Sequence, residues 1–471
     1  MPKADRDNRE LVKTIRKFCR RHGIAESTFG RHSVNDGKIV GRITNGGWIE
    51  AGTERRVREF MDRADRGEIV LYGRPRRKKS RSNAETMSEL ISSETSVRTA
   101  GSFAFHEQRQ RFHIFANTTN ESWAVADRIA PELTAIAPSG EGIRILYAPM
   151  DNGIILTRTL RALHAAFPDT PILVVMKGRG LEDLRNTMGR LVDRMAEHPL
   201  SAFILTNMYV REAVELRKIS DDNPDELVWR KVALEGNRSY DFQVQVAKLY
   251  GDLANEWLIH PGSHGQPVYA KPSIISIYRK DRAGDLAGIL PDDGECLRFD
   301  YALLNHPYLH SHTMRFRIEH MLGPVFDRLA TGGRMTVIQS QGDDPAHEIV
   351  RKVWPGQPLP RTSRYEIIRD FGKALRSDGR SFGFTGLTDA RSLFRFDMHT
   401  LPILRERNLG IQSLSAAFNN AVYFGQVKEE LAQAAIREGS RYLQITEDVL
   451  RKHGGMWFVN ESMSVTRRSV H

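Results

Sequence analysis

From about residue 101, short apolar runs alternate with longer stretches of helical periodicity, and this pattern constrains the fold more than any other feature of the sequence. The first run is GIRILYAP (142–149), followed by the helical stretch IILTRTLRALHAAF (154–167). ILVVM (172–176) and SAFILTN (201–207) then repeat the arrangement. Such alternation is typical of a mostly parallel sheet covered by helices. The sequence therefore predicts an α/β fold for residues 101–471.

Two further strands are expected after a long interval. LRFDYALLNHPY (297–308) predicts a fourth strand and its exit, and RMTVIQS (334–340) predicts a fifth after the turn TGG. A helix over 315–330 would connect them. The roughly 90 residues between the third and fourth strands exceed what a crossover needs, so we expect an insertion at about 210–298. Its polar and aromatic residues either form a polar lid or, for most of them, lie at the surface: Glu235, Arg238, Trp257, His260 and His264.

The segment FDYALLNHPYLH, a helix and then LATGGRMTVIQS together resemble part of the class I S-adenosylmethionine-dependent methyltransferases. In that family a Phe-Asp leads into the fourth strand, and a Gly-Gly turn precedes the fifth. GGMWFVNESMSVTRR (454–468) would then be the closing antiparallel strand, with a neighbour within 381–401. The resemblance implies a doubly wound, Rossmann-like methyltransferase sheet and S-adenosylmethionine as cofactor.

The family carries an acid and then Gly-x-Gly-x-Gly after the first strand, where glycines let the backbone approach the cofactor. Here Tyr147 stands at the acid, Pro149 stands at a glycine, and Ala148 and Gly153 match. Asp151 offers a replacement polar contact. The resemblance therefore assigns Tyr147, Ala148, Asp151 and Gly153 to cofactor binding through a degenerate loop.

The ends of the second and third strands complete the expected cofactor site. The family places a carboxylate for the ribose hydroxyls after the second strand, and this chain has Lys177 there, with Glu182 and Asp183 just beyond. Thr206 and Asn207 end the third strand. Asn207 either hydrogen-bonds the adenine amino group, as the family's Asp or Asn often does, or caps the segment that follows.

Asn305-His306-Pro307-Tyr308 lies where amino-methyltransferases keep Asn/Asp-Pro-Pro-Tyr. In that motif the Asn and a backbone carbonyl accept hydrogen bonds from a planar amino group, and the aromatic ring stacks on the substrate. The resemblance makes Asn305 and Tyr308 catalytic, and the alternative is a polar loop without a catalytic role. No carboxylate has ligand spacing to the nearby histidines, so no metal site is predicted.

The excess positive charge lies entirely near the N-terminus. Residues 1–84 hold 22 Lys or Arg and 11 Asp or Glu, a net charge of 22 − 11 = +11, which equals the net charge of the whole chain. Such asymmetry indicates either a polyanionic partner for residues 1–84 or a solvated basic face.

Four short helices are expected within residues 1–73. Leu11, Ile15 and Phe18 share one helical face in the first, a second begins near Glu26, and a third spans about 35–47 with Asn35 or Asp36 as its cap. Thr53 is expected to cap a fourth, which presents an apolar stripe of Val57, Phe60 and Met61.

This arrangement resembles a helix-turn-helix of the lambda-repressor type, whose third helix enters the major groove. The resemblance implies nucleic-acid contacts by Arg31, Lys38 and Arg42, and the alternative is a small helical bundle without that role. Because such modules often act as dimers, a homodimer is one expectation.

The remaining features concern organisation and compartment. Residues 74–100, which begin with the basic run RPRRKKSR, are expected to be a linker. Two cysteines, Cys19 and Cys296, have no metal-ligand spacing, and no apolar run approaches the length of a membrane span. We therefore expect a cytoplasmic protein without membrane contact.

Three functions remain open from the sequence. The first is a methyltransferase that the N-terminal module guides to nucleic acid, with an amino nitrogen as one candidate acceptor. The second is a DNA-binding regulator whose methyltransferase-like domain has lost catalysis. The third is a small-molecule methyltransferase with a basic docking module.

Overall fold

The chain folds into two separate units, which the computed structural model assigns to residues 1–91 and 92–471. The structure describes residues 3–22, 24–34, 36–45, 48–66, 95–138, 140–219, 226–261, 267–291, 296–357, 359, 361–401 and 409–469. The basic run at 74–81, the proposed cap Asn35 and His264 lie outside these residues.

The N-terminal unit is all-α, as predicted. Its helices are α1 (Lys3–Arg21), α2 (Glu26–Val34), α3 (Ile39–Thr44) and α4 (Ala51–Asp65). The expected apolar faces of the first and fourth helices are buried together in one core around Phe29: Leu11, Ile15, Phe18, Val57, Phe60 and Met61. Edge-to-face ring contacts join Phe29 to Phe18 and to Phe60, which ties α2 to both long helices.

Two local predictions for this unit are wrong. The third helix is shorter than expected and begins only at Ile39, because the preceding residues form a turn in which Asp36 Oδ1 accepts the N–H of Lys38 (2.9 Å). Thr53 does not cap α4. The helix already begins at Ala51 after extended Glu50, and the Thr53 hydroxyl accepts a hydrogen bond from Arg56 instead.

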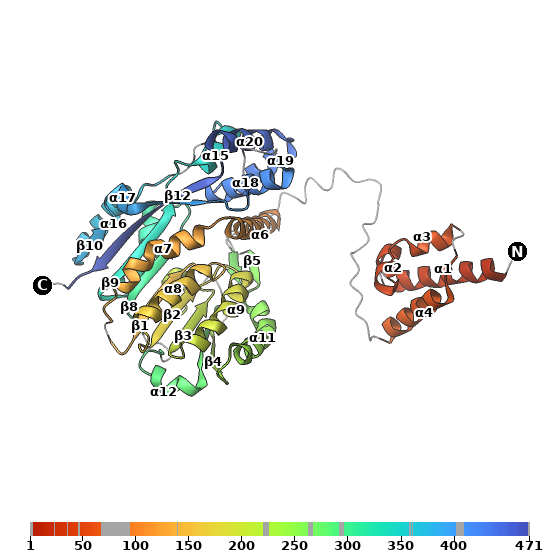
Figure 1. Cartoon of the computed structure of the whole chain (residues 1–471), viewed down its shortest axis with the longest axis horizontal. Helices are drawn as coiled ribbons and strands as arrows, with labels where there is room; N and C mark the ends of the chain where they lie inside the picture. The colour runs from red at the N-terminus through yellow and green to blue at the C-terminus, as the bar shows by residue number, and fades with distance from the viewer. Residues whose placement is uncertain are drawn as a thin grey trace. The chain divides into compact units, whose positions relative to one another are not determined.

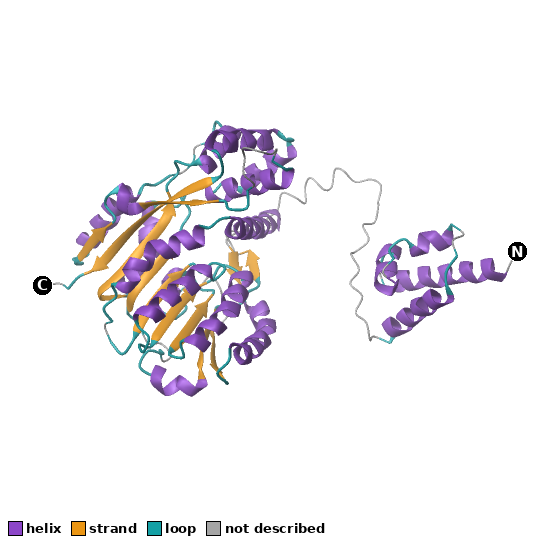
Figure 2. Cartoon of the chain, viewed as in Figure 1, coloured by secondary structure: helices purple, strands orange, loops and turns teal. Residues whose placement is uncertain are grey.

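The C-terminal unit is built around a 10-stranded mixed sheet (Figures 1 and 2). The strands are β1 (Ile143–Ala148), β2 (Ile172–Lys177), β3 (Ser201–Thr206), β4 (Val228–Leu234), β7 (Ser273–Arg279), β8 (Phe299–Asn305), β9 (Leu329–Ser340), β10 (Phe382–Thr385), β11 (Leu393–Asp397) and β12 (Trp457–Arg467). Their order is β10-β12-β9-β8-β1-β2-β3-β7-β4, with β11 also paired to β12. β5 (Ile259–Pro261) and β6 (Pro267–Tyr269) form a separate small hairpin.

Helices cover both faces of this sheet, which confirms the predicted doubly wound α/β class. One face packs against α7 (Glu121–Thr134), α8 (Ile154–Ala166), α9 (Leu181–Glu197) and α11 (Ser239–Glu256). The other packs against α10 (Val210–Ala213), α12 (Ala283–Leu286), a π-helical turn at Ile318–Leu322, α14 (Gly323–Asp327) and α16 (Arg364–Ser377). β1 supplies both layers, because alternate residues of a strand point to opposite faces.

A third apolar cluster lies beyond the end of the sheet where β12 begins (Figure 1). It joins α6 (Thr95–Thr118), α15 (Pro345–Val353), α18 (Ile411–Phe424), α19 (Glu429–Arg437) and α20 (Arg441–His453). Phe115 of α6 packs among Phe396, Phe424 and Phe458 at its centre. These helices therefore cover the edge of the sheet toward which most parallel strands run.

The second half of the sheet follows the predicted pattern. β12 is antiparallel to β9, and on its other side it pairs with β10 and β11, the predicted neighbours. The expected turn at 331–333 lies within the long strand β9, where Gly332 has a φ of +84°. The insertion extends the first half of the sheet, because β7 pairs antiparallel with β3 and parallel with β4.

Candidate functional site

The carboxyl ends of β8, β1 and β2 meet at one edge of the sheet. Ala148 of β1 pairs with Leu304 of β8, and Tyr147 pairs with Met176 of β2. Ligands of open α/β sheets bind outside this edge, at the loops that follow the strands. The residues predicted for the cofactor site are therefore brought to neighbouring loops.

The loop after β1 forms a tight bend into α8. Gly153 precedes the helix with a φ of +82°, a conformation that favours glycine. Asp151 Oδ1 accepts the N–H of Gly153 (2.8 Å), and Asn152 Oδ1 accepts that of Ile154 (3.2 Å). A β-carbon at Gly153 would lie 3.1 Å from the Cα of Thr187 in α9. Hydrogen bonds from its own side chains therefore hold the bend, and α9 packs against it.

Tyr147 packs in the apolar layer under α7 and α8, and its hydroxyl lies beside the Asp151 carboxylate of the bend. Its ring lines an apolar cavity of about 10 Å³ between β1 and α8. Burial, reinforced by the neighbouring Asp151 carboxylate, raises the pKa of the Tyr147 hydroxyl well above its ordinary value. Tyr147 therefore packs beneath the loop next to Asp151, and at 2% exposure its ring is not open to a ligand.

Two buried carboxylates lie near the bend. Asp151 is 6% exposed, and burial raises its pKa to about 6 even though the Gly153 N–H opposes the shift. Asp183 of α9 is fully buried and forms an ion pair with Arg109 of α6. Burial outweighs that ion pair and raises the pKa of Asp183 to about 6. Both carboxyl groups therefore change charge slightly below neutral pH.

Lys177 ends β2 and folds back on its own backbone. Its Nζ donates to the Gly178 carbonyl (2.5 Å) and lies 5.8 Å from the ring centroid of Tyr269. Burial, with a further contribution from the Arg179 charge, lowers the pKa of Lys177 to about 7. The position that the family uses for a ribose-binding carboxylate is thus taken by a partly buried amine.

Gly178, the next residue, is covered by Trp257. A β-carbon at Gly178 would lie 2.6 Å from two atoms of the indole ring, and the terminal methyl of Met150 would be closer still. Trp257 is only 2% exposed, and its indole N–H has no hydrogen-bond partner among the residues that the structure describes. Trp257 is therefore not one of the insertion residues that lie at the surface, because its side chain packs against Gly178 at the end of β2.

Thr206 and Asn207 already serve the protein's own backbone. Asn207 Nδ2 donates to the Lys271 carbonyl (2.8 Å), and its Oδ1 accepts the N–H of Ser273 (2.9 Å). Thr206 Oγ1 accepts the N–H of Met208 (3.1 Å). Asn207 thus fixes the start of β7 rather than capping the segment after β3.

Asn305 lies at the end of β8, beside the loop of β1. It is 8% exposed, and its Oδ1 has no hydrogen-bond partner among the described residues. His306 follows with a φ of +47°, and its Nε2 lies 2.8 Å from Glu121 Oε1 at the start of α7. Because Glu121 also accepts from Asn460 of β12, the corner after β8 is tied to two distant elements.

Arg179 crosses this edge of the sheet. It follows β2, yet its Nη2 donates to the His306 carbonyl after β8 (2.6 Å). β1 lies between those two strands, so the arginine spans the end of β1. The contact links the loops expected to flank a cofactor.

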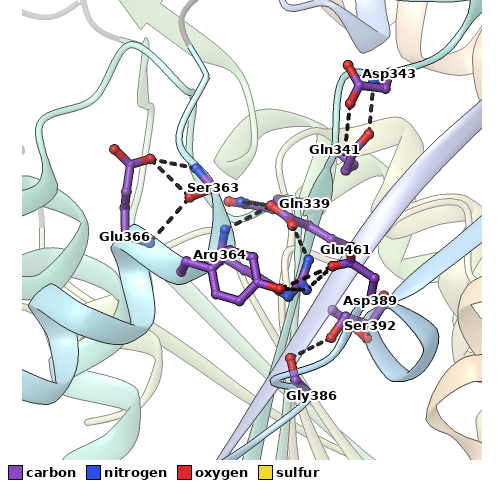
Figure 3. Close-up of polar contacts among 12 residues, drawn as sticks. Gln339, Gln341, Asp343, Ser363, Arg364, Glu366, Gly386, Asp389, Ser392 and Glu461 are labelled. Atoms are coloured by element: carbon purple, nitrogen blue, oxygen red, sulfur yellow. Dashed lines mark hydrogen bonds and ion pairs between the residues drawn. The ribbon is translucent and has the colours of Figure 1, made fainter.

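Tyr308 is buried and held by a network of polar side chains. Its hydroxyl donates to Gln339 Oε1 (3.0 Å), and the Gln339 amide donates to Glu461 Oε1 and to the Thr362 carbonyl (2.7 Å each). Glu461 in turn pairs with Arg364 (3.0 Å), as Figure 3 shows. The network joins β9, β12 and α16, so Tyr308 positions the loop after β8 rather than presenting an open aromatic face.

The predicted nucleic-acid residues lie on the N-terminal unit alone. Arg31 of α2, Lys38 just before α3 and Arg42 of α3 are all exposed. Arg42 forms an ion pair with Asp36 (2.8 Å), and Arg31 lies against Gly37 in the turn between the two helices. The three cations thus belong to one turn and its flanking helices.

Sequence reasoning missed Arg109, Glu121 and Arg179. Their partners lie 74, 185 and 127 residues away, so no local pattern marks them. Within the described residues, no group of three His, Cys, Asp or Glu side chains could hold a metal ion. The described helices also include none long and apolar enough to cross a membrane.

Comparison with known proteins gives only distant structural similarity. No protein-family model matches the chain, and no curated protein matches it in sequence. Loganic acid methyltransferase with SAH is 10% identical over 74% of this chain and 94% of its own, with a TM-score of 0.32.

Two further solved structures are similar at the same level. Geranyl diphosphate methyltransferase, in complex with GPP and sinefungin, is 10% identical over 72% of this chain and 77% of its own (TM-score 0.25). Phosphoethanolamine N-methyltransferase 2 of Haemonchus contortus is 8% identical over 73% and 53% (TM-score 0.26). Scores of this size do not assign a family, and the fold class rests on the strand order described above.

Proposed function

We propose that residues 92–471 form an S-adenosylmethionine-dependent methyltransferase domain. One observation carries the proposal: the edge of the sheet brings the glycine bend of Asp151 and Gly153 beside Asn305, whose buried Oδ1 lacks a partner among the described residues. An unpartnered buried acceptor is costly and favours a ligand that donates a hydrogen bond.

The residues around β1 fit such a cofactor. The Gly153 bend begins α8, so its backbone and the start of that helix would hold the polar methionine end, with Asp151 beside it. S-adenosylmethionine supplies an electrophilic methyl group when it is bound. Asn305 Oδ1 would orient a donor group of the methyl acceptor, and Asp151, with its pKa of about 6, would take up a proton near that pH.

In the described conformation, the residues after β2 and β3 leave no room or free polar groups for the cofactor. Trp257 and Met150 fill the space over Gly178, and the side chains of Thr206 and Asn207 are engaged with backbone groups. Arg179 also spans the end of β1. Cofactor binding therefore requires Trp257 and Arg179 to be displaced.

Calorimetric titration of the full chain with S-adenosylmethionine tests the proposal. We expect micromolar binding that Gly153→Ala weakens, because a β-carbon there meets Thr187 and the positive φ is strained. Gly189→Ala, in α9 with open space around it, is the matched control. Absence of binding at millimolar cofactor would refute the enzyme.

The packing of Trp257 and the bridge by Arg179 favour a second function. In that function the domain has lost catalysis, and the protein is a DNA-binding regulator whose sheet serves as a scaffold. Binding of duplex DNA without detectable S-adenosylmethionine binding would support this alternative. In both functions, we propose that residues 1–84 contact nucleic acid through Arg31, Lys38 and Arg42.

A further inference from the structure

Arg317 is a buried cation that forms no ion pair with the described residues, although the Glu366 carboxylate acts on it from farther away. It ends α13 (Met314–Arg317) and is 1% exposed. Its Nη2 donates to the His310 carbonyl (2.7 Å), whereas Nε and Nη1 have no acceptor among the described residues. The guanidinium lies 4.7 Å from the centroid of the Tyr308 ring, and no ion pair reaches it from the described part of the chain. Burial of an unpaired charge is unfavourable unless an anion compensates it.

Two histidines on the adjoining loop also have unused nitrogen atoms. His310 is 9% exposed, and its Nε2 is paired with Ser340 Oγ (2.9 Å). The Nδ1 atoms of His310 and His312 are buried, and neither has a partner in the described part of the chain. Burial and the Arg317 charge lower the pKa of both rings, so each ring is neutral and carries one N–H. His310 Nδ1 is a donor in the tautomer whose Nε2 accepts from Ser340 Oγ.

The nearby carboxylates are engaged elsewhere. Glu366 accepts from the N–H and hydroxyl of Ser363 at the start of α16. Glu461 pairs with Arg364, and Asp344 pairs with His347. Each of these three carboxylates is therefore bound to another group, and none of them accepts a hydrogen bond from Arg317, His310 or His312.

We propose that Arg317, His310 and His312 bind an oxyanion of a small-molecule ligand, a phosphate or a carboxylate. A guanidinium can donate two parallel hydrogen bonds to such a group, and a neutral imidazole can donate another. The site adjoins the loop that begins with Asn305, so the ligand is the methyl acceptor if the proposed function holds. The acceptor would then be an anionic molecule.

Thermal unfolding of the full chain in sodium phosphate tests the site, with sodium chloride of equal ionic strength as reference and sodium acetate as the carboxylate arm. We expect the transition of the C-terminal unit to rise with phosphate or acetate in wild type and in Arg315→Met. Arg315 lies on the same short helix but is 83% exposed and paired with Glu319. Arg317→Met should reduce the rise in phosphate to the general salt effect that both proteins share, because it removes the charge at similar length.

Each result decides the inference. An equal rise in Arg317→Met, or no anion-specific rise in wild type, would overturn it. If Arg317→Met fails to fold, His312→Ala is used, and an unchanged phosphate affinity in that variant also overturns the site. Because the titration contains no S-adenosylmethionine, loss of the proposed methyltransferase function would leave the anion response intact, and the two failures are distinguishable.

Discussion

Trp257 lies directly against Gly178 at the carboxyl end of β2, where a β-carbon would fall 2.6 Å from two atoms of the indole ring. The two residues are far apart in sequence, and they meet because the insertion returns beneath the sheet edge. The contact closes the region beside Lys177 that the family resemblance assigns to the ribose. It therefore determines both the local stability and the room available to a cofactor.

Gly178→Ala should lower the free energy of unfolding of the C-terminal unit by about 1–3 kcal/mol, because the added methyl group overpacks Trp257 and Met150. Urea denaturation measures the change. Gly189→Ala has open space within α9 and should raise stability by about 0.5–1 kcal/mol. Equal stability of Gly178→Ala and wild type would show that the indole moves aside without cost.

Trp257 should also report cofactor binding, since S-adenosylmethionine needs the space that its ring fills. Titration of wild type should change the intrinsic fluorescence as the indole is displaced. Trp257→Phe should bind the cofactor with a much smaller change, because Trp257 is the tryptophan that packs against Gly178, whereas Trp123 on α7 is already 55% exposed. A fluorescence response that survives the substitution undiminished would place the cofactor elsewhere.

Asp151→Asn should change the pH dependence of stability. The folded-state pKa of about 6 lies above the ordinary 3.8, so the group stabilises the fold fully below pH 4, and that stability is lost as pH rises through 6. Two pKa units correspond to about 3 kcal/mol. The variant should lose less stability than wild type between pH 4 and 7, keeping only the loss that Asp183 contributes, as urea denaturation at pH 4, 5, 6 and 7 would show. The exposed Asp127→Asn should follow the wild-type curve, and a matching Asp151→Asn curve would contradict the prediction.

Arg111 should be essential for attaching the helices beyond the sheet edge. Its guanidinium donates two hydrogen bonds of 2.8 Å to the carboxylate of Glu429, and both residues are buried. Arg111→Ala leaves a buried carboxylate unpaired and should cost about 3–5 kcal/mol. Arg451→Ala breaks an exposed pair with Glu447 and should change stability by less than about 1 kcal/mol. Chemical denaturation measures both changes. Similar losses of unfolding free energy in the two variants would contradict the prediction.

Lys38→Ala combined with Arg42→Ala should weaken binding of duplex DNA by at least about tenfold. The slope of log K against log salt should also fall by about 0.9 for each phosphate that the variant no longer neutralises. Fluorescence anisotropy over a salt series measures both quantities. Lys13→Ala with Lys17→Ala removes the same charge at the same spacing on α1 and should have little effect. If the two double variants lose the same affinity for DNA, binding depends on net charge alone and the assignment of Lys38 and Arg42 is wrong.

The strands were predictable because each is an apolar run buried on both faces, as β1, β2, β3 and β8 are. The resemblance also placed the antiparallel closing strand correctly. The partners of the site were not predictable, since His306 and Glu121 are separated by 185 residues. An apolar run likewise does not reveal direction, so the antiparallel position of β7 between β3 and β4 was missed.

The capping and binding chemistry of single polar residues predicted their roles poorly, because tertiary packing decides which partners they reach. Thr53 has the side chain of a helix cap, but α4 begins two residues earlier. Asn207 has the chemistry to bind adenine, but its amide is used on Lys271 and Ser273. The sequence shows which groups a polar side chain can bind. The packing determines whether its hydrogen bonds are already made to other residues of the protein.

The position of β12 has a consequence for biosynthesis. This strand follows the other described strands in the sequence, yet it lies between β9 on one side and β10 and β11 on the other. Until the ribosome has made residues 457–467, a nascent chain therefore holds three strands whose shared partner does not yet exist. A premature stop codon shortly before Trp457 would leave those edges open to aggregation.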